Sequence, residues 1–462
     1  MVKKMIVKHI IPFEYELPVE IFLNTFQHSA HFEENDMTFT DDLKINSSLL
    51  ERCKEKHFIT KFKVLKFNKN TIMNEILSNH KHHMSFKEKI GNKTDDFTIK
   101  NIDVYIFGSQ TGFIIIDFEI FSNSVEEIVN TSYYLKMIKS KYVRDVEVHK
   151  KIGKNDIKTY DLDLVSVYEE IHDLMGIRNN IYLSSELLVY SAVLFDNADD
   201  KNNDSLLSIL AHGYKKSYKL SGNLSNTIKK FDNIHWCSSI EGVACFSYLS
   251  DDDTTNDFLV NNFFTKAGAL NSVYLFLYLL VLNQRMVMQN LNVRINKIST
   301  QNMNNEIDKI HQGINDIRVH ISNYEVNFVY RDISRNSTYN EYYNMLYQTQ
   351  NLDDLLFDYK NRLNGLEQLY KIVTSNLEKR KRKSDNEKNR KISNIAKFGI
   401  LIAFIAFLPN FREVVLSISS DLDCDIESYP VMLILFIIGL VVLIIRGLII
   451  WYINKSKENF YE

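Results

Sequence analysis

Apolar residues recur at alternating intervals of four and three positions through residues 352–377, inside a helical pattern that begins near Tyr339. The members of this seam are Leu352, Leu356, Tyr359, Leu363, Leu366, Tyr370, Val373 and Leu377. Such spacing places them on one face of a helix and is typical of a coiled coil. It predicts a stalk helix that associates along the seam. An amphipathic helix packed on a globular core has the same spacing and is the alternative.

Two apolar stretches follow the seam, at residues 394–418 and 431–453. Each is long enough to cross a hydrocarbon layer of about 30 Å, so the pattern predicts two transmembrane helices. The loop between them carries the acidic residues Asp421, Asp423, Asp425 and Glu427. Positive charge lies outside the pair, most densely at Lys379–Lys383. By the positive-inside rule we expect a protein of the bacterial inner membrane, with both termini in the cytoplasm and the loop outside.

Small and polar residues recur every three or four positions along one face of the first predicted span. They are Ala396, Gly399, Ala403, Ala406, Asn410 and Glu413. Small side chains let helices approach closely or leave room for a pore, and polar groups at membrane depth favour a bundle interior or water. We predict that this face lines a pore in a ring of subunits. Packing of the two spans within one subunit is the alternative.

Apolar and polar residues alternate in several segments before the stalk, which is the period of half-buried strands. A strand is predicted at 3–17 and another at 57–67, with hairpins at 102–120 and 233–249. A helix is predicted at about 124–140. Strands and helices that intermingle in this way predict a mixed α/β domain.

A strongly apolar piece at 267–282 is predicted to be a buried helix. Asn271, Ser272 and Asn283 cut its apolar run below the roughly 18 residues that a membrane helix needs. Helical pattern then continues to about Val326. The predicted organisation is a cytosolic α/β domain at 1–255, a region of long antiparallel and coiled-coil helices at 256–393, a transmembrane hairpin at 394–453 and a cytosolic tail at 454–462.

Composition and charge narrow the functional classes. The 462 residues carry a formal net charge of -3, so no global basic field indicates direct binding of nucleic acid. The basic residues of 379–397 are local and lie where anionic lipid headgroups would meet them. The four cysteines show no metal-binding spacing, which fits a reducing compartment.

Few residues suggest chemistry. His80, His82 and His83 form the most metal-like cluster, but no carboxylate has a coordinating spacing, so a solvated loop is the favoured interpretation. Gly108–Gly112 lacks the lysine of a phosphate-binding loop and is predicted to be a hairpin turn. No catalytic constellation with interpretable spacing is present, so we predict neither an enzyme nor a metal site.

The order of these segments resembles the CorA family of magnesium transporters. Local sequence similarity is confined to the end of the chain, at Leu363–Leu377, Phe407–Pro409 and Tyr429–Val431. The family's Gly-Met-Asn signature is absent, because Ile418–Ser420 stand where it is expected. The resemblance implies a homo-oligomer, a pentamer, with the first span innermost in a lipid bilayer.

A long N-terminal region without that signature looks like the CorA-like membrane effectors of type III CRISPR systems. This resemblance implies an antiviral channel or effector gated by a nucleotide second messenger, a conjugate of S-adenosylmethionine and AMP, and it assigns no ligand-binding residue. One alternative is a divalent-cation transporter of unusual selectivity, sensing magnesium through acidic clusters. Those clusters, which also suit solvated loops, are Asp199, Asp200, Asp204 and Asp251–Asp253. The other alternative is a membrane-anchored scaffold that conducts nothing.

Overall fold

The chain forms two compact units, Met1–Lys371 and Ile372–Glu462. The predicted boundary at residue 255 falls inside a short helix of the first unit. The computed structural model describes residues 1–35, 46–55, 58–79, 82–87, 96–137, 145–151, 157–175, 181–183, 187–196, 204–218, 226–299, 307–327, 329–330, 333–421, 439–440, 442–443 and 446–447.

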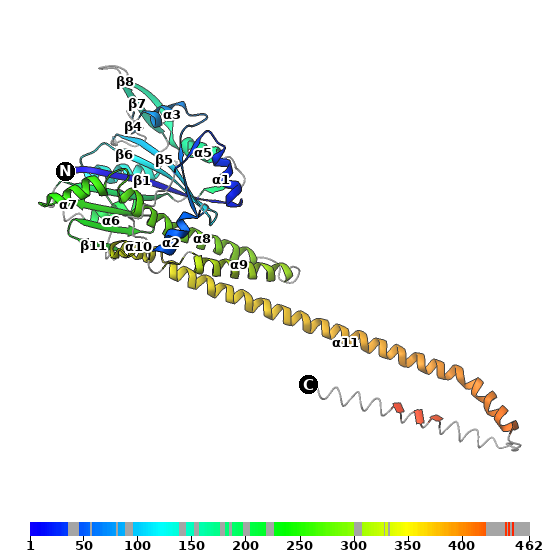
Figure 1. Cartoon of the computed structure of the whole chain (residues 1–462). Helices are drawn as coiled ribbons and strands as arrows, with labels where there is room; N and C mark the ends of the chain where they lie inside the picture. The colour runs from blue at the N-terminus through cyan, green and yellow to red at the C-terminus, as the bar shows by residue number, and fades with distance from the viewer. Residues whose placement is uncertain are drawn as a thin grey trace. The chain divides into compact units, whose positions relative to one another are not determined.

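The first unit is built on one β-sheet with helices on both faces (Figure 1). Its described strands are β1 (Val2–Tyr15), β2 (Phe32–Asn35), β3 (Ile59–Val64), β4 (His83–Phe86), β5 (Phe97–Phe107), β6 (Thr111–Ile120), β7 (Asp145–Lys151), β8 (Ile157–Asp163), β9 (Ile181–Leu183), β10 (Leu188–Phe195), β11 (Thr227–Phe231), β12 (Ile234–Ser239) and β13 (Gly242–Tyr248).

The main path of the sheet has the strand order β11-β12-β13-β10-β1-β6-β5-β4-β7-β8. All paired strands among the described residues are antiparallel except β10 and β13, which are parallel. β1 lies in the middle because both of its faces are apolar. Val7 and Ile11 enter one core, while Ile6 and Ile10 enter the other.

Helices account for much of the remaining described chain. They are α1 (Val19–Gln27), α2 (Ser47–Lys54), α3 (Thr71–Ser78), α4 (Val125–Lys136), α5 (Leu164–Leu174), α6 (Asp204–His212), α7 (Asp253–Asp257), the π-helices η4 (Phe258–Phe263) and η5 (Leu270–Tyr274), then α8 (Leu275–Ser299), α9 (Ile307–Asn327), α10 (Ser337–Thr349) and α11 (Leu352–Asp421). α1, α3, α4, α5 and α6 cover one face of the sheet. α2, η4, η5, α8 and α10 cover the other.

The strands and hairpins predicted from alternation are confirmed. β1 and β3 lie within the segments predicted at 3–17 and 57–67, apart from one residue at the start of β1. β5 and β6 form the first hairpin, and β12 and β13 form the second. The mixed α/β domain followed by long helices is therefore the observed fold.

The apolar piece at 267–282 is buried, as predicted. Within the described part of the chain, Leu270–Ile298 is the one helical stretch whose length and hydropathy suit a membrane span, but 78% of its most apolar window is buried inside the unit. The second predicted span, 431–453, lies almost wholly outside the described residues. The first, 394–418, is the C-terminal part of α11, where many side chains are likewise not described.

The seam of α11 packs on helices of its own chain, which corrects the prediction of a stalk that associates through it. Tyr359, Leu363 and Leu366 are at most 6% exposed. They share a third core with α8 and α9, through Met288, Leu291, Ile295, Ile298, Ile310, Ile314, Ile317, Ile321 and Tyr324. In this part of the seam the apolar stripe packs against two other long helices of the same chain.

The prediction of one continuous helix from Tyr339 onward is also wrong. It breaks at Gln350 and Asn351, between α10 and α11. Asn351 has a φ of 50°, the left-handed conformation that asparagine tolerates better than most residues. The chain turns there, so α10 belongs to the sheet's helical layer and α11 begins a separate helix.

Candidate functional site

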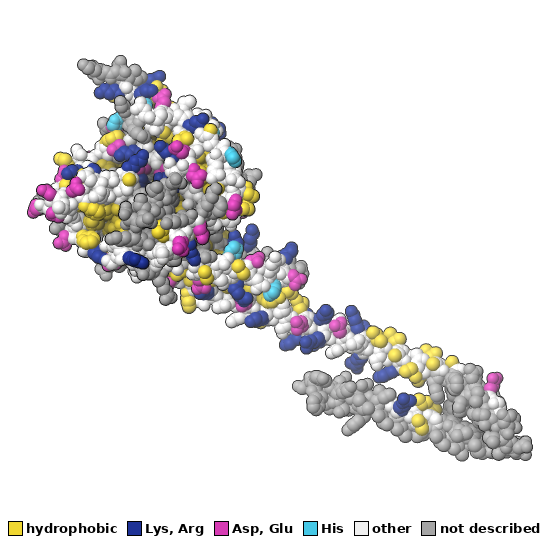
Figure 2. Space-filling model, in the orientation of Figure 1, with side chains coloured by type: hydrophobic (Ala, Val, Ile, Leu, Met, Phe, Trp, Pro, Cys, Tyr) yellow, Lys and Arg dark blue, Asp and Glu magenta, His cyan; other side chains and the backbone are white. Residues whose placement is uncertain are grey.

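The second unit contains a long exposed stretch of helix α11. Every residue of α11 from 378 to 403 is exposed, a length of about 39 Å at 1.5 Å per residue. Its first part carries the basic block, the residues Lys379, Arg380, Lys381, Arg382, Lys383, Lys388, Arg390, Lys391 and Lys397. Figure 2 shows these dark blue side chains on the helix, followed by a run of yellow hydrophobic ones. Charge and apolar surface thus succeed each other along one rod.

The described apolar side chains that follow the basic block on α11 are exposed in several directions around the helix. Ile395, Phe398 and Ile400 are 68–71% exposed, and Leu401 and Ile402, which point in other directions around the helix, are 57% and 64% exposed. Burial of apolar surface contributes about 25 cal/mol per Å², so a helix that is apolar all round requires an apolar surrounding. Lipid or other copies of the helix would supply one.

The residues predicted to line a pore all belong to α11. Ala396, Gly399, Ala403, Ala406 and Glu413 are exposed, and a Cβ added to Gly399 would meet nothing within 4 Å. The continuous helix keeps this small-residue face (Ala396, Gly399, Ala403, Ala406, Asn410, Glu413) on one side, although the side chain of Asn410 lies outside the described residues. Asp421 is the last residue of α11; Asp423, Asp425 and Glu427 are not described.

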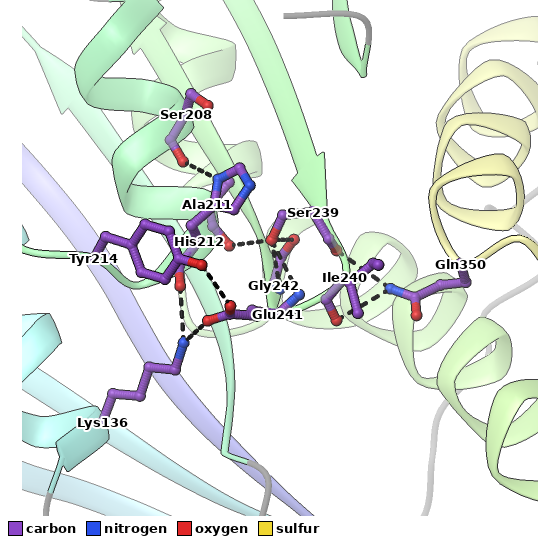
Figure 3. A network of polar contacts seen from close by, with 10 residues as sticks. All are labelled: Lys136, Ser208, Ala211, His212, Tyr214, Ser239, Ile240, Glu241, Gly242 and Gln350. Carbon is purple, nitrogen blue, oxygen red and sulfur yellow. Dashed lines mark hydrogen bonds and ion pairs between the residues drawn. The ribbon is translucent and has the colours of Figure 1, made fainter. Parts of the chain in front are cut away.

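At its other end, α11 begins beside a polar junction in the first unit (Figure 3). Gln350, at the end of α10, is 2% exposed and donates hydrogen bonds from Nε2 to the carbonyl oxygens of Ser239, at 3.2 Å, and Ile240, at 3.5 Å. Its Oε1 accepts from Arg285 of α8. One amide therefore joins the β12–β13 turn, α8 and the start of α11.

The same turn is held from its opposite side. Glu241 forms an ion pair with Lys136, the last residue of α4, and accepts a hydrogen bond of 2.8 Å from the Tyr214 hydroxyl. Lys136 also donates to the carbonyl of His212 at the end of α6. The hydrogen bond to Glu241, with burial, raises the pKa of Tyr214. Figure 3 shows both sets of contacts converging on the one turn.

The backbone of this turn is tightly packed. Ser239 accepts hydrogen bonds at Oγ from the N–H groups of Glu241 and Gly242 and donates to the carbonyl of Ala211. A Cβ at Gly242 would lie 2.5 Å from the Val189 carbonyl oxygen, so only glycine fits. These contacts fix the backbone conformation of the turn between the two sets of side-chain contacts.

The sequence did not indicate this junction. Its members come from five separate segments, and none belongs to a motif. The one local signal was the Gln350-Asn351 pair, because Asn351 tolerates a positive φ and the pair lies within the helix expected from Tyr339 onward, just before the seam.

The histidine cluster differs from its prediction. His82 is 5% exposed and lies 4.0 Å from the Glu75 carboxylate, and burial lowers its pKa, so it does not belong to a solvated loop. The ring of His83 contacts that of Phe121, with 4.5 Å between centroids. His80 is outside the described residues, among which no group of three potential metal ligands occurs.

The remaining candidates have structural roles. Gly108–Gly112 contains the β5–β6 turn, as predicted, and Ser109 and Thr111 both donate to Oδ1 of Asn283 in α8. Asp252 caps α7, and Asp204 begins α6 and pairs with Lys229 at 2.5 Å. Asp199 and Asp200 are not described.

No family model and no curated protein matches this chain. The functional argument therefore rests on three features of the chain itself. These are the uncovered apolar helix, the basic block that precedes it and the polar junction at its start.

Proposed function

We propose that the protein is an oligomeric, CorA-like membrane effector whose N-terminal α/β domain binds a small regulatory ligand. The observation that carries the proposal is the exposed apolar part of α11, which follows eight basic residues at 379–391 and contains the ninth, Lys397, near its start. A basic segment beside an apolar helix suits a membrane whose cytoplasmic leaflet is anionic. In this proposal α11 from about 394 is the first span, 431–453 is the second, and both chain ends are cytoplasmic.

The proposal includes a ring of subunits. One hairpin encloses no pore, whereas several copies of the small-residue face could surround one. A lone α11 also leaves its apolar surface and the polar Glu413 with no protein partner in the described chain. Packing that face inward would direct Glu413 to the interior and leave Leu401 and Phe398 for lipid. By resemblance to CorA proteins, the ring is a pentamer.

The ligand in this proposal is a nucleotide second messenger, the conjugate of S-adenosylmethionine and AMP, acting in type III CRISPR defence. This part rests on the resemblance described above. A ligand gates a channel only if it binds one arrangement more tightly than the other. The polar junction offers a route for such a bias, because the Gln350 side chain ties the sheet to the beginning of α11.

The experiment that tests the function compares ligands on the purified full-length protein in detergent. We expect the S-adenosylmethionine–AMP conjugate to raise the thermal midpoint by several degrees at a hundredfold excess over its Kd, since binding then adds about 2.7 kcal/mol. Magnesium at millimolar concentration should change the midpoint little. Stabilisation by magnesium, with no response to the conjugate, would favour a cation transporter. No response to either would favour a scaffold.

A further inference from the structure

A cavity of about 840 Å³ opens at one end of the sheet in the first unit. Its walls are the start of β1, the end of β6 and residues 121–124, which lead into α4. A backbone hydrogen bond joins two of these walls, from the N–H of Val2 to the Asn123 carbonyl at 3.2 Å. The N–H of Phe121 donates to the carbonyl of Asp96, which precedes β5, at 2.9 Å. These bonds hold the start of β1 and residues 121–123 in position beside the cavity.

The lining combines three kinds of contact. Phe121 is an aromatic side chain with 43% of its surface exposed, and its ring is supported by the ring of His83. Ser122 and Asn123 offer a hydroxyl and an amide, and Lys3 offers a cation. An exposed ring beside hydrogen-bonding groups and one positive charge suits a ligand that carries a flat base and a phosphate.

The polar groups are held in place by the first turn of α4. Ser122 accepts a hydrogen bond of 3.0 Å from the N–H of Ser124 and donates one to the Glu127 carboxylate. Glu127 is thus already engaged with its neighbour. Phosphate binding would rely on Lys3, which belongs to the wall formed by β1.

We propose that this cavity is the nucleotide site of the protein, an inference that rests on the proposed function and locates its ligand. A base stacks on Phe121, Asn123 hydrogen-bonds the base or ribose, and Lys3 faces the phosphate. Size supports the choice. Ligand pockets usually have about 300–1,000 Å³, a range that includes this cavity, whereas the groove between β11 and α10 has about 230 Å³.

The cavity is connected to the helices that surround the start of α11. Lys4, next to the cavity wall, donates a hydrogen bond of 2.7 Å to the carbonyl of Val260 in η4. β6 ends at Ile120 in the cavity and begins at Thr111, which bonds to Asn283 of α8. Two residues further on, α8 carries Arg285, the partner of Gln350. Binding at the cavity therefore acts on one end of a strand whose other end is fixed to α8.

The test compares Phe121→Ala with Phe231→Ala, a matched control. Phe231 lies on β11, outside this cavity, and is 45% exposed against 43% for Phe121. Binding of the S-adenosylmethionine–AMP conjugate to the full-length protein in detergent is measured by calorimetry. Loss of one stacking contact should weaken binding roughly 5- to 100-fold in Phe121→Ala. Phe231→Ala should bind like the wild type, and both should keep the wild-type thermal midpoint without ligand.

A second variant and a photoreactive label distinguish loss of the binding site from a folding defect. Lys3→Glu should weaken binding more at low salt than at high salt, because screening reduces its repulsion of phosphate. A conjugate carrying an azide on its adenine should label a peptide that contains residues 121–127 of the wild-type protein. Wild-type affinity in Phe121→Ala, equal loss in both phenylalanine variants or labelling elsewhere would overturn the site while leaving the proposed function intact. Failure of the wild type to bind the conjugate would overturn both.

Discussion

At the scale of single residues, the centre of the sheet contains a histidine that must remain neutral. His9 of β1 is fully buried, and neither ring nitrogen has a hydrogen-bond partner among the described residues. Its ring meets that of Phe118 edge-on, with 5.1 Å between centroids. Burial, with a smaller contribution from the charge of Lys136, lowers the pKa of His9 to about 3. A charged imidazole at this position would lack both water and a partner.

This predicts a specific sensitivity to acid. Because the folded-state pKa lies below the unfolded value of about 6.5, the neutral form stabilises the fold above pH 6.5, and this stability is lost as pH falls toward 3. Between pH 7.5 and pH 5.0 the free energy of unfolding falls by about 2 kcal/mol through this histidine. The thermal midpoint should therefore fall between these two pH values in both proteins, but by a few degrees less in His9→Leu than in the wild type. The exposed His28→Leu should follow the wild type. Equal acid sensitivity of His9→Leu and wild type would mean that His9 does not control this step.

Residue chemistry also explains why the polar junction escaped prediction. Gln350 and Glu241 are 109 positions apart, and each reads locally as an ordinary surface residue. Their partners are mostly backbone carbonyls and single side chains, Lys136, Tyr214 and Arg285, which carry no sequence signature. The membrane candidates were different, because a basic block followed by apolar residues is a local pattern that needs no folded structure to be recognised.

At the scale of elements, the same hydrophobic spacing suits packing within one chain and association between chains. A 4-3 spacing defines an apolar stripe but does not identify its partner. α9 carries a matching stripe at Ile310, Ile314, Ile317, Ile321 and Tyr324, and together with α8 it covers the seam of α11 as far as Leu366. Beyond the third core the seam is only half-buried, at Val373 and Leu377. The seam therefore holds the chain's own helices together before the second unit begins.

Substitution of Leu363 distinguishes packing within the chain from association between chains. Leu363→Ala removes a side chain that is 5% exposed in the third core and should destabilise the first unit by about 2–4 kcal/mol. Leu369, on the same helix, is 49% exposed, so Leu369→Ala should cost less than about 0.5 kcal/mol. Thermal unfolding followed by circular dichroism measures both. Dissociation of an oligomer by Leu363→Ala, with an unchanged midpoint, would contradict the intrachain packing.

The elements that could be predicted are those defined by their own residues. Alternation identified β1, β3 and both hairpins. Strand order is a different matter. β10 pairs with β1 on one side and, in parallel, with β13 on the other, across separations of roughly 180 and 50 residues. Such pairings depend on which apolar faces meet in three dimensions, and the local pattern of apolar and polar residues does not specify which strands pair.

At the scale of the whole molecule, the two units expose different kinds of surface. The first buries its longest apolar helix stretch, Leu270–Ile298, inside its own packing. The second leaves Ile395, Phe398 and Ile400 of α11 uncovered. Apolar helix surface is thus buried in the first unit and exposed in the described part of the second. Under the proposed function, the exposed apolar part of α11 contacts a bilayer on one side and other copies of itself on another. These two contacts are distinguished by direction around the helix.

Disulfide cross-linking in a Cys424→Ser background makes that separation. Ala403 belongs to the small-residue face, and Leu401, also exposed in the single chain, lies roughly 160° around the helix at 100° per residue. In a ring with the first span innermost, Ala403→Cys residues of neighbouring subunits meet near the axis, while Leu401→Cys residues face lipid. Mild oxidation in membranes should therefore convert Ala403→Cys to covalent dimers, detected on non-reducing gels, and leave Leu401→Cys monomeric. Cross-linking through Leu401→Cys alone would place the apolar face at the subunit contact, and the small-residue face would then line no pore.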